Sequence, residues 1–184
     1  MKYTRLPLLI AMMALLFAAD VQAQDLHPSR RASPLGMARS FVGDVYVKVT
    51  FSQPYKRNRD NIIGAGEDFM HPYGEVWRFG ANEPTEITFS GPVKVGDTQV
   101  DAGTYSVFSR PGASSWMLYF NDLQGGGAGD YEESKNVATV EVPVSMLDEE
   151  ADQFSISLEE QGDGLHMVTM WLDWKLEVPI MPAE

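Results

Sequence analysis

The chain has no cysteine among its 184 residues. This absence excludes a disulfide framework, a lipid anchor on a cysteine after a signal peptide, and a cysteine nucleophile. The folded state must therefore be held by its hydrophobic core, and about 160 residues beyond a leader are enough to bury one.

Histidine is almost as scarce, with only His27, His71 and His166, and none of them has the His-x-His or His-x3-His spacing of a metal site. We therefore predict no metal and no cofactor. The sequence also lacks a Gly-x-Ser-x-Gly motif, so a serine hydrolase triad has no support from sequence.

Basic residues are few, with 14 Lys and Arg against 26 Asp and Glu and a formal charge of −12. Such a chain repels phosphate backbones, and we expect no nucleic-acid partner. The single basic cluster, Lys56-Arg57-Asn58-Arg59, is too small to change that expectation, and we interpret it as a solvated loop.

Only one long apolar run is present, from Leu6 to Ala19, preceded by Lys2 and Arg5. It is shorter than the roughly 20 residues of a membrane span and ends near Val21-Gln22-Ala23, which is typical of a signal-peptidase site. We predict a signal peptide over residues 1–23 cut after Ala23, a periplasmic or secreted protein, and no membrane span after cleavage. The mature chain would carry a formal charge of −13, since cleavage removes Lys2, Arg5 and Asp20.

The remaining chain is divided into a leader and one domain. Residues 24–40 are polar and interrupted by Pro28, Pro34 and Gly36, which indicates a flexible leader, and residues 41–184 are assigned to a single β domain. Alternating apolar residues and Gly- or Pro-rich turns predict strands at 45–52, 93–95, 98–100, 103–109, 116–120, 137–144, 154–158 and 165–179. The only candidate helical turn is at 145–152. The fold class is all-β, an antiparallel β-sandwich of about eight or nine strands, with a β-barrel as the alternative.

Alternation in the last strand separates two faces. His166, Val168, Met170, Leu172, Trp174 and Leu176 share the face that we assign to the core, and Trp171 lies on the opposite face. Trp171 and Trp116 are therefore candidate stacking platforms for a sugar or peptide, although core packing is the favoured interpretation for both.

The most informative stretch runs from Trp77 to Phe89, where a Trp, an Arg, an Asn and two Glu residues precede or enter a strand. If Trp77 and Phe79 point into the core, Arg78 faces away and meets Glu86 in a structural bridge, while Asn82 completes a turn. This structural interpretation is favoured.

The alternative is a ligand pocket. In that interpretation Trp77, Arg78, Asn82, Glu83 and Glu86 lie beside the long 53–75 loop, which contributes His71 and Tyr73, because binding residues often sit on loops carried by a rigid scaffold.

Residues 73–90, Tyr-Gly-Glu-Val-Trp-Arg-Phe-Gly-Ala-Asn-Glu-Pro-Thr-Glu-Ile-Thr-Phe-Ser, and residues 102–108, Ala-Gly-Thr-Tyr-Ser-Val-Phe, closely resemble an exported bacterial family catalogued as domain of unknown function 2911. The resemblance extends from about Ser33 to Pro179 and implies export and a single β-rich domain. It supplies no catalytic residue, cofactor or substrate. The chain departs from the family pattern in the loop over residues 56–64, so the resemblance assigns no ligand contact there.

Three functions remain open. The first is a non-catalytic binding module for a small molecule, glycan or peptide. The second is a hydrolase, for example one acting on carbohydrate, that uses Glu83 or Glu86 and requires a carboxyl group with a raised pKa. The third is a structural partner in an envelope assembly, for which an exposed apolar patch would be the signature.

Overall fold

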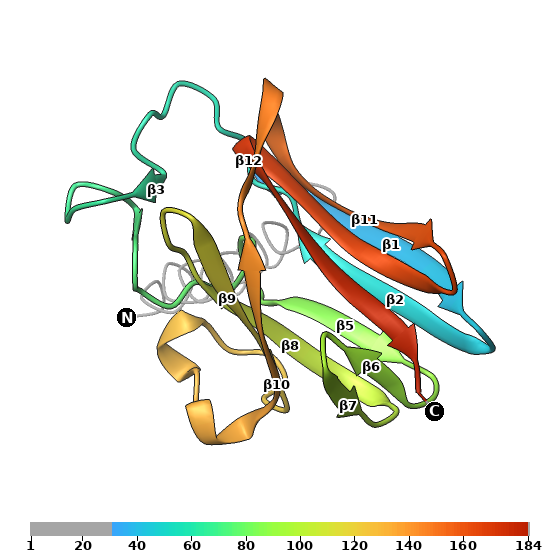
Figure 1. The fold of residues 1–184 in the computed structure, drawn as a ribbon. Coiled ribbons are helices and arrows are strands. Elements are labelled where there is room, and N and C mark those ends of the chain that lie inside the picture. Colours follow the sequence, from blue (N-terminus) through green and yellow to red (C-terminus); the bar gives the residue numbers. More distant parts are fainter. Residues whose placement is uncertain (1–30, 184) are drawn as a thin grey trace, which may run out of the picture.

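The computed structural model describes residues 31–183, which form two antiparallel sheets packed face to face (Figure 1). The larger sheet has six strands in the order β1-β2-β5-β8-β9-β10. Their bounds are β1 Leu35–Val42, β2 Val45–Ser52, β5 Thr85–Phe89, β8 Gly103–Arg110, β9 Ser115–Asn121 and β10 Asn136–Pro143. The predicted signal peptide and the first part of the predicted leader lie outside the described residues.

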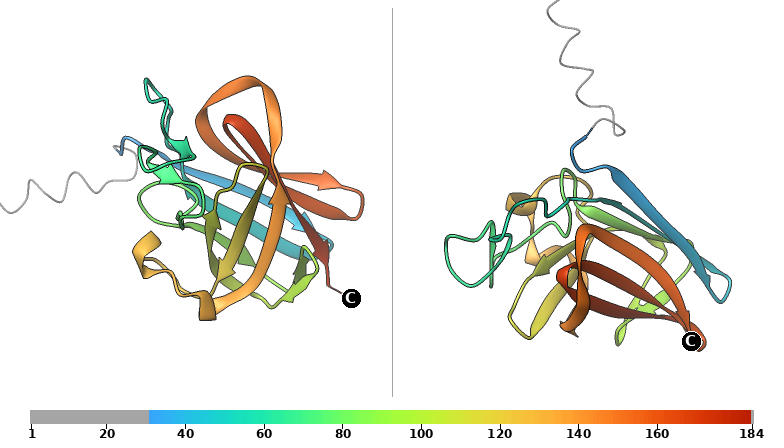
Figure 2. Two further views of the ribbon diagram at one scale, coloured as in Figure 1. Left: turned by 60° about the vertical axis from the view of Figure 1, so that its left-hand side comes forward. Right: turned by 90° about the horizontal axis from the view of Figure 1, so that it is seen from above.

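The smaller sheet has four strands in the order β11-β12-β6-β7. Two long strands, β11 Ser145–Gln161 and β12 Gly164–Pro182, form a hairpin that covers one face of the larger sheet (Figure 2). The short hairpin of β6 Val93–Val95 and β7 Thr98–Val100 extends this sheet through β12. Both sheets are open, so the sandwich prediction is confirmed and the barrel alternative is not.

The long loop after β2 contains little regular structure, as its Pro and Gly residues indicated. A two-residue parallel pair, β3 Ile63–Gly64 and β4 His71–Pro72, is its main ordering element. Two 3-10 turns, η3 Ala128–Asp130 and η4 Glu133–Lys135, connect β9 to β10. Within residues 31–183 no helix is both long and apolar enough to cross a membrane.

The core lies between the two sheets and is rich in aromatic residues. Alternate residues of β2, Val47, Val49 and Phe51, are buried, as the period of two predicted. A group of large rings fills the centre between the sheets: Trp77, Phe79, Trp116, Phe154, Trp171 and Trp174.

Two of the predicted boundaries are wrong. Residues 35–40 were assigned to the flexible leader, but they pair with β2 along the whole of β1. Their alternation was hard to see because β1 is an outermost strand whose outward side chains, among them Leu35 and Met37, are themselves apolar. Residues 145–152, the candidate helical turn, belong to β11.

The two faces of the last strand were assigned correctly only in its second half. Before Leu172, Met167, Thr169 and Trp171 of the opposite face are buried, together with Val168 of the predicted face, and after Leu172 the buried set is Trp174, Leu176, Val178 and Ile180. Leu172 has a φ of 54°, and the pairing with β11 shifts register on either side of it. The left-handed conformation of Leu172 interrupts the extended backbone of β12, so the side chains after it alternate in the opposite phase.

Candidate functional site

Trp77 is a structural residue at the centre of the core. It is 1% exposed, and its backbone forms a two-bond bridge with Ser109 of β8, with N–O distances of 2.7 and 2.8 Å. Its indole N–H donates to the carbonyl of Gly80 at 3.0 Å. Phe79 is also buried, so both aromatic residues of the motif point inward, which was the condition for facing Arg78 away from the core.

The residues after Trp77 form a tight turn rather than a strand. Phe79 and Asn82 have φ values of 52° and 58°, in the left-handed region. The Arg78 guanidinium donates to the Asn82 carbonyl at 2.6 Å, and the Thr85 hydroxyl donates to the Phe79 carbonyl. These bonds close the turn and satisfy its buried polar groups.

The predicted bridge between Arg78 and Glu86 is wrong. Among residues 31–183, no carboxylate lies within 4 Å of the Arg78 guanidinium, which is used instead to close the turn. Strand alternation could not place Arg78 because the left-handed residues end the extended backbone directly after it.

Asn82 and Glu83 hold the segment that leads into β1. The Asn82 side-chain amide donates to the Ser33 carbonyl at 3.1 Å and to the Ser52 hydroxyl at 3.0 Å. Glu83 accepts from the Arg31 guanidinium at 2.5 to 2.6 Å. Sequence analysis missed Arg31, Ser33 and Ser52, because their proximity depends on β1 returning along the end of β2.

The carboxyl group of Glu83 is stabilised in its charged form. Its bond from Arg31 lowers the pKa of Glu83 below the usual value, against a smaller opposing effect of burial. A general acid in a hydrolase needs the opposite shift. This observation weighs against Glu83 as the acid of the hydrolase alternative.

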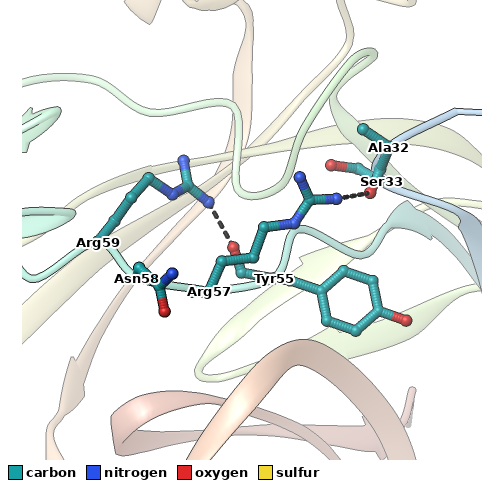
Figure 3. Close-up of a pocket in the computed structure, with 6 residues that line it drawn as sticks. All are labelled: Ala32, Ser33, Tyr55, Arg57, Asn58 and Arg59. Carbon is teal, nitrogen blue, oxygen red and sulfur yellow. Dashed lines mark hydrogen bonds between the residues drawn. The ribbon is translucent and has the colours of Figure 1, made fainter.

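Two pockets flank segment 31–33. One, of about 290 Å³, is lined by residues that include Arg31, Glu83 and Glu86. The other, of about 490 Å³, is lined by Ala32, Ser33, Tyr55, Arg57, Asn58 and Arg59 (Figure 3). Both lie at one end of the sandwich, where β1 begins, β2 ends and β5 begins.

Three residues of the basic cluster, Arg57, Asn58 and Arg59, line this pocket. Arg57 and Asn58 are exposed, as expected of a solvated loop, and the pocket is a feature that the sequence interpretation did not include. The sequence feature that could have indicated this pocket was the clustering of basic side chains in a chain with an excess of acids.

His71 lines neither pocket. Its ring centroid is 5.1 Å from that of Trp77, with the planes tilted by 32°. Burial lowers the pKa of His71 to about 4, and the charges of Arg78 and Arg59 lower it further in the same direction. Tyr73 is 40% exposed and also lines neither pocket.

The candidate stacking platforms are part of the core. Trp116 and Trp171 are 2% and 1% exposed, so neither ring is available to a sugar or peptide, and the favoured interpretation of core packing is confirmed. Within residues 31–183, no group of three or more His, Cys, Asp or Glu is arranged to hold a metal ion.

These features define an antiparallel β-sandwich with two neighbouring pockets at one end. A family model described as "Protein of unknown function (DUF2911)" matches residues 33–180, and the chain belongs to this family. The match includes the whole Trp77–Glu83 turn and loop 53–60, and it begins at Ser33, after Arg31 and Ala32. No curated protein and no solved structure gave a significant match.

Proposed function

We propose that the protein is a non-catalytic binding module that holds a small molecule, glycan or peptide at the end of the sandwich formed by segment 31–33, loop 53–60 and the Trp77–Glu83 turn. The observation that carries this proposal is the use of Asn82 and Glu83 to fix segment 31–33 as the wall between two pockets. The larger pocket, at about 490 Å³, is within the usual range for small-ligand sites.

The site is also built on a rigid support. Loop 53–60 is tied to β11 by bonds from Phe154 N to Pro54 O at 2.9 Å and from Lys56 N to Asp152 O at 2.6 Å. Trp77 anchors the turn in the core beneath it. Preorganised walls of this kind reduce the entropy that a ligand loses on binding.

Thermal unfolding of the purified protein against a panel of neutral glycans, charged sugars and short peptides tests this proposal. A ligand at 100 times its dissociation constant adds roughly 2.7 kcal/mol to the free energy of unfolding. We expect one ligand class to raise the midpoint, and Glu83→Gln to remove the rise while the protein remains folded, because the Arg31 contact that holds the wall is weakened. Glu160→Gln, an exposed acid on β11, is the matched control.

If no class raises the midpoint, or if Glu83→Gln and Glu160→Gln respond alike to the ligand, the proposal is wrong. The comparison between the two variants removes the general effect of losing one negative charge.

We also propose export to the periplasm or beyond. The support is the sequence of residues 1–23 alone, with Lys2 and Arg5 before the apolar run and Val21-Gln22-Ala23 at its end. Intact-mass measurement of the protein from a cell envelope or medium fraction is expected to give a chain that begins at Gln24. A chain retaining Met1 or Lys2 would contradict cleavage.

A specific observation supports a second candidate function, the structural partner. Leu35, Met37 and Phe41 are 56%, 58% and 60% exposed on alternate positions of β1, an outermost strand of the larger sheet. Such a strand can pair with the same strand of a second copy. Light scattering is expected to give a dimer that Met37→Lys converts to a monomer, and a monomer at all concentrations would exclude this form of assembly.

A further inference from the structure

The larger pocket has an unusual lining for so acidic a protein. Two of its six residues are arginines, Arg57 and Arg59, and none is an acid. The chain as a whole has 26 acidic and 14 basic side chains. The guanidinium groups of both arginines project on the same side of the loop, above Asn58 (Figure 3).

Neither arginine is neutralised by a carboxylate. Arg59 donates to the backbone carbonyls of Lys56, at 3.2 Å, and Tyr55, and to the Met70 sulfur at 3.7 Å, which leaves two of its five N–H groups. Arg57 reaches the Ala32 carbonyl at 3.5 Å. No Asp or Glu oxygen of residues 31–183 lies within 4 Å of either guanidinium.

Lys56, which directly precedes Arg57 in the same loop, provides the contrast. Its ammonium group lies 2.7 Å from Glu150 and 3.7 Å from Asp60. The acids near this loop therefore neutralise the lysine and leave the arginines with charge and N–H donors available to a ligand.

The loop holds these arginines in a defined conformation. Arg57 has a φ of 54°, a conformation that is costly for a side-chain-bearing residue, and its backbone N–H donates to the Asp152 carboxylate at 2.9 Å. Tyr55 forms a backbone bridge with Gln153 of β11. The backbone is thus held at Tyr55 and at Arg57.

A second observation shows that the positive charge reaches beyond the loop. His71 has a pKa of about 4, and after burial the charges of Arg78 and Arg59 are its causes. The half-buried His71 imidazole therefore stays neutral at neutral pH and adds no charge of its own.

We propose that this pocket binds the phosphate group of a phosphorylated sugar. This inference rests on the proposed function of the same site. Arg57 and Arg59 hold the phosphate oxygens, because a guanidinium presents its N–H donors in a planar fork that matches them. The Asn58 amide adds a donor, and the Tyr55 ring at the edge of the pocket packs against the sugar.

Titration calorimetry with glucose 6-phosphate, glucose and inorganic phosphate tests the inference. We expect glucose 6-phosphate to bind at least tenfold more tightly than glucose, and inorganic phosphate to compete with it. Arg57→Gln and Arg59→Gln are each expected to weaken glucose 6-phosphate binding at least tenfold. Arg39→Gln, which removes the same charge from β1, is expected to change binding less than twofold.

Co-sedimentation with phosphatidylcholine vesicles containing phosphatidic acid distinguishes a lipid phosphate from the phosphate of a soluble sugar. Binding to these vesicles that Arg57→Gln and Arg59→Gln remove, without binding of glucose 6-phosphate, would keep the phosphate site and assign it to a lipid head group. Thermal unfolding of each variant, with a midpoint near that of the wild type, shows that lost binding is not lost folding.

The outcomes separate this inference from the proposed function. If neutral glycans or peptides bind and glucose 6-phosphate, phosphate and the anionic vesicles do not, the phosphate inference is wrong and the binding module stands. The same conclusion follows if phosphate ligands bind equally to the wild type and both arginine variants. If no ligand of either panel binds, both are wrong.

Discussion

The indole rings of Trp77 and Trp171 stack with centroids 6.0 Å apart and planes 22° from parallel. Trp77 is bridged to β8 of the larger sheet, and Trp171 belongs to β12 of the smaller one, so the contact joins the two layers of the sandwich. The turn that carries Arg78, Asn82 and Glu83 is therefore positioned by the core itself.

Trp77→Ala is expected to lower the free energy of unfolding by about 3–5 kcal/mol, because it empties a site that contacts five other rings. Trp77→Phe retains part of this packing but loses the indole bond to Gly80, and it is expected to cost less. Urea unfolding followed by circular dichroism measures both. Tyr73→Ala, at a 40% exposed ring, is the control and is expected to cost under about 1 kcal/mol. Equal losses at both positions would show that Trp77 is not central to the core.

His71 is expected to make the protein less stable as the pH falls through the range from about 6.5 to about 4. Within this window the unfolded chain binds a proton at His71 and the folded chain does not, because burial and the Arg78 and Arg59 charges lower the pKa in the folded state to about 4. Since the unfolded state binds more protons, the free energy of unfolding decreases on acidification, by at most about 2 kcal/mol between pH 7 and pH 5.

The measurement is the free energy of unfolding of the wild type and His71→Gln at pH 7, 6 and 5. The variant is expected to have the flatter profile, because glutamine does not titrate. A decrease of the same size in both proteins would show that His71 does not titrate in this window.

The β6–β7 hairpin turn depends on Gly96, with a φ of 58°. An added Cβ would meet the Val140 side chain at 3.2 Å, whereas at Gly43, with a φ of 55°, it would meet open space. Gly43→Ala is expected to cost about 1 kcal/mol from backbone strain alone, and Gly96→Ala more. The difference between the unfolding midpoints of Gly43→Ala and Gly96→Ala measures the effect of the Val140 contact. A smaller decrease for Gly96→Ala than for Gly43→Ala would show that the Val140 side chain moves aside.

The features of the fold that the sequence predicted were local ones, namely strands and a hairpin turn. The alternation of Val47, Val49 and Phe51 and the Gly96-Asp97 turn specified strands and a hairpin that the structure confirms. The inward direction of Trp77 and Phe79 was assumed in the sequence interpretation, and the structure has it. The buried face of Trp171 was not predicted. The sequence alternates regularly through this strand and does not indicate that Leu172 is left-handed or that the pairing with β11 shifts register there.

The candidate site was only partly predictable. Glu83 and Glu86 do line one pocket, as the motif suggested, and whether they bind a ligand stays a hypothesis. The partners of Asn82 and Glu83, on segment 31–33, are about 50 residues away in the chain. Nothing local to either segment indicates this proximity.

By itself the sequence determined the fold class, the family, the absence of disulfides and the acidic charge, because composition and short-range periodicity carry that information. Only the tertiary structure decided where Arg57 and Arg59 lie and which acids neutralise Lys56. Antiparallel pairing brings the start of β1, the end of β2 and the start of β5 to one end of the sandwich. Charged residues that are distant in sequence lie close together there. The net charge at that end of the sandwich therefore depends on strand register rather than on residues that are neighbours in the chain.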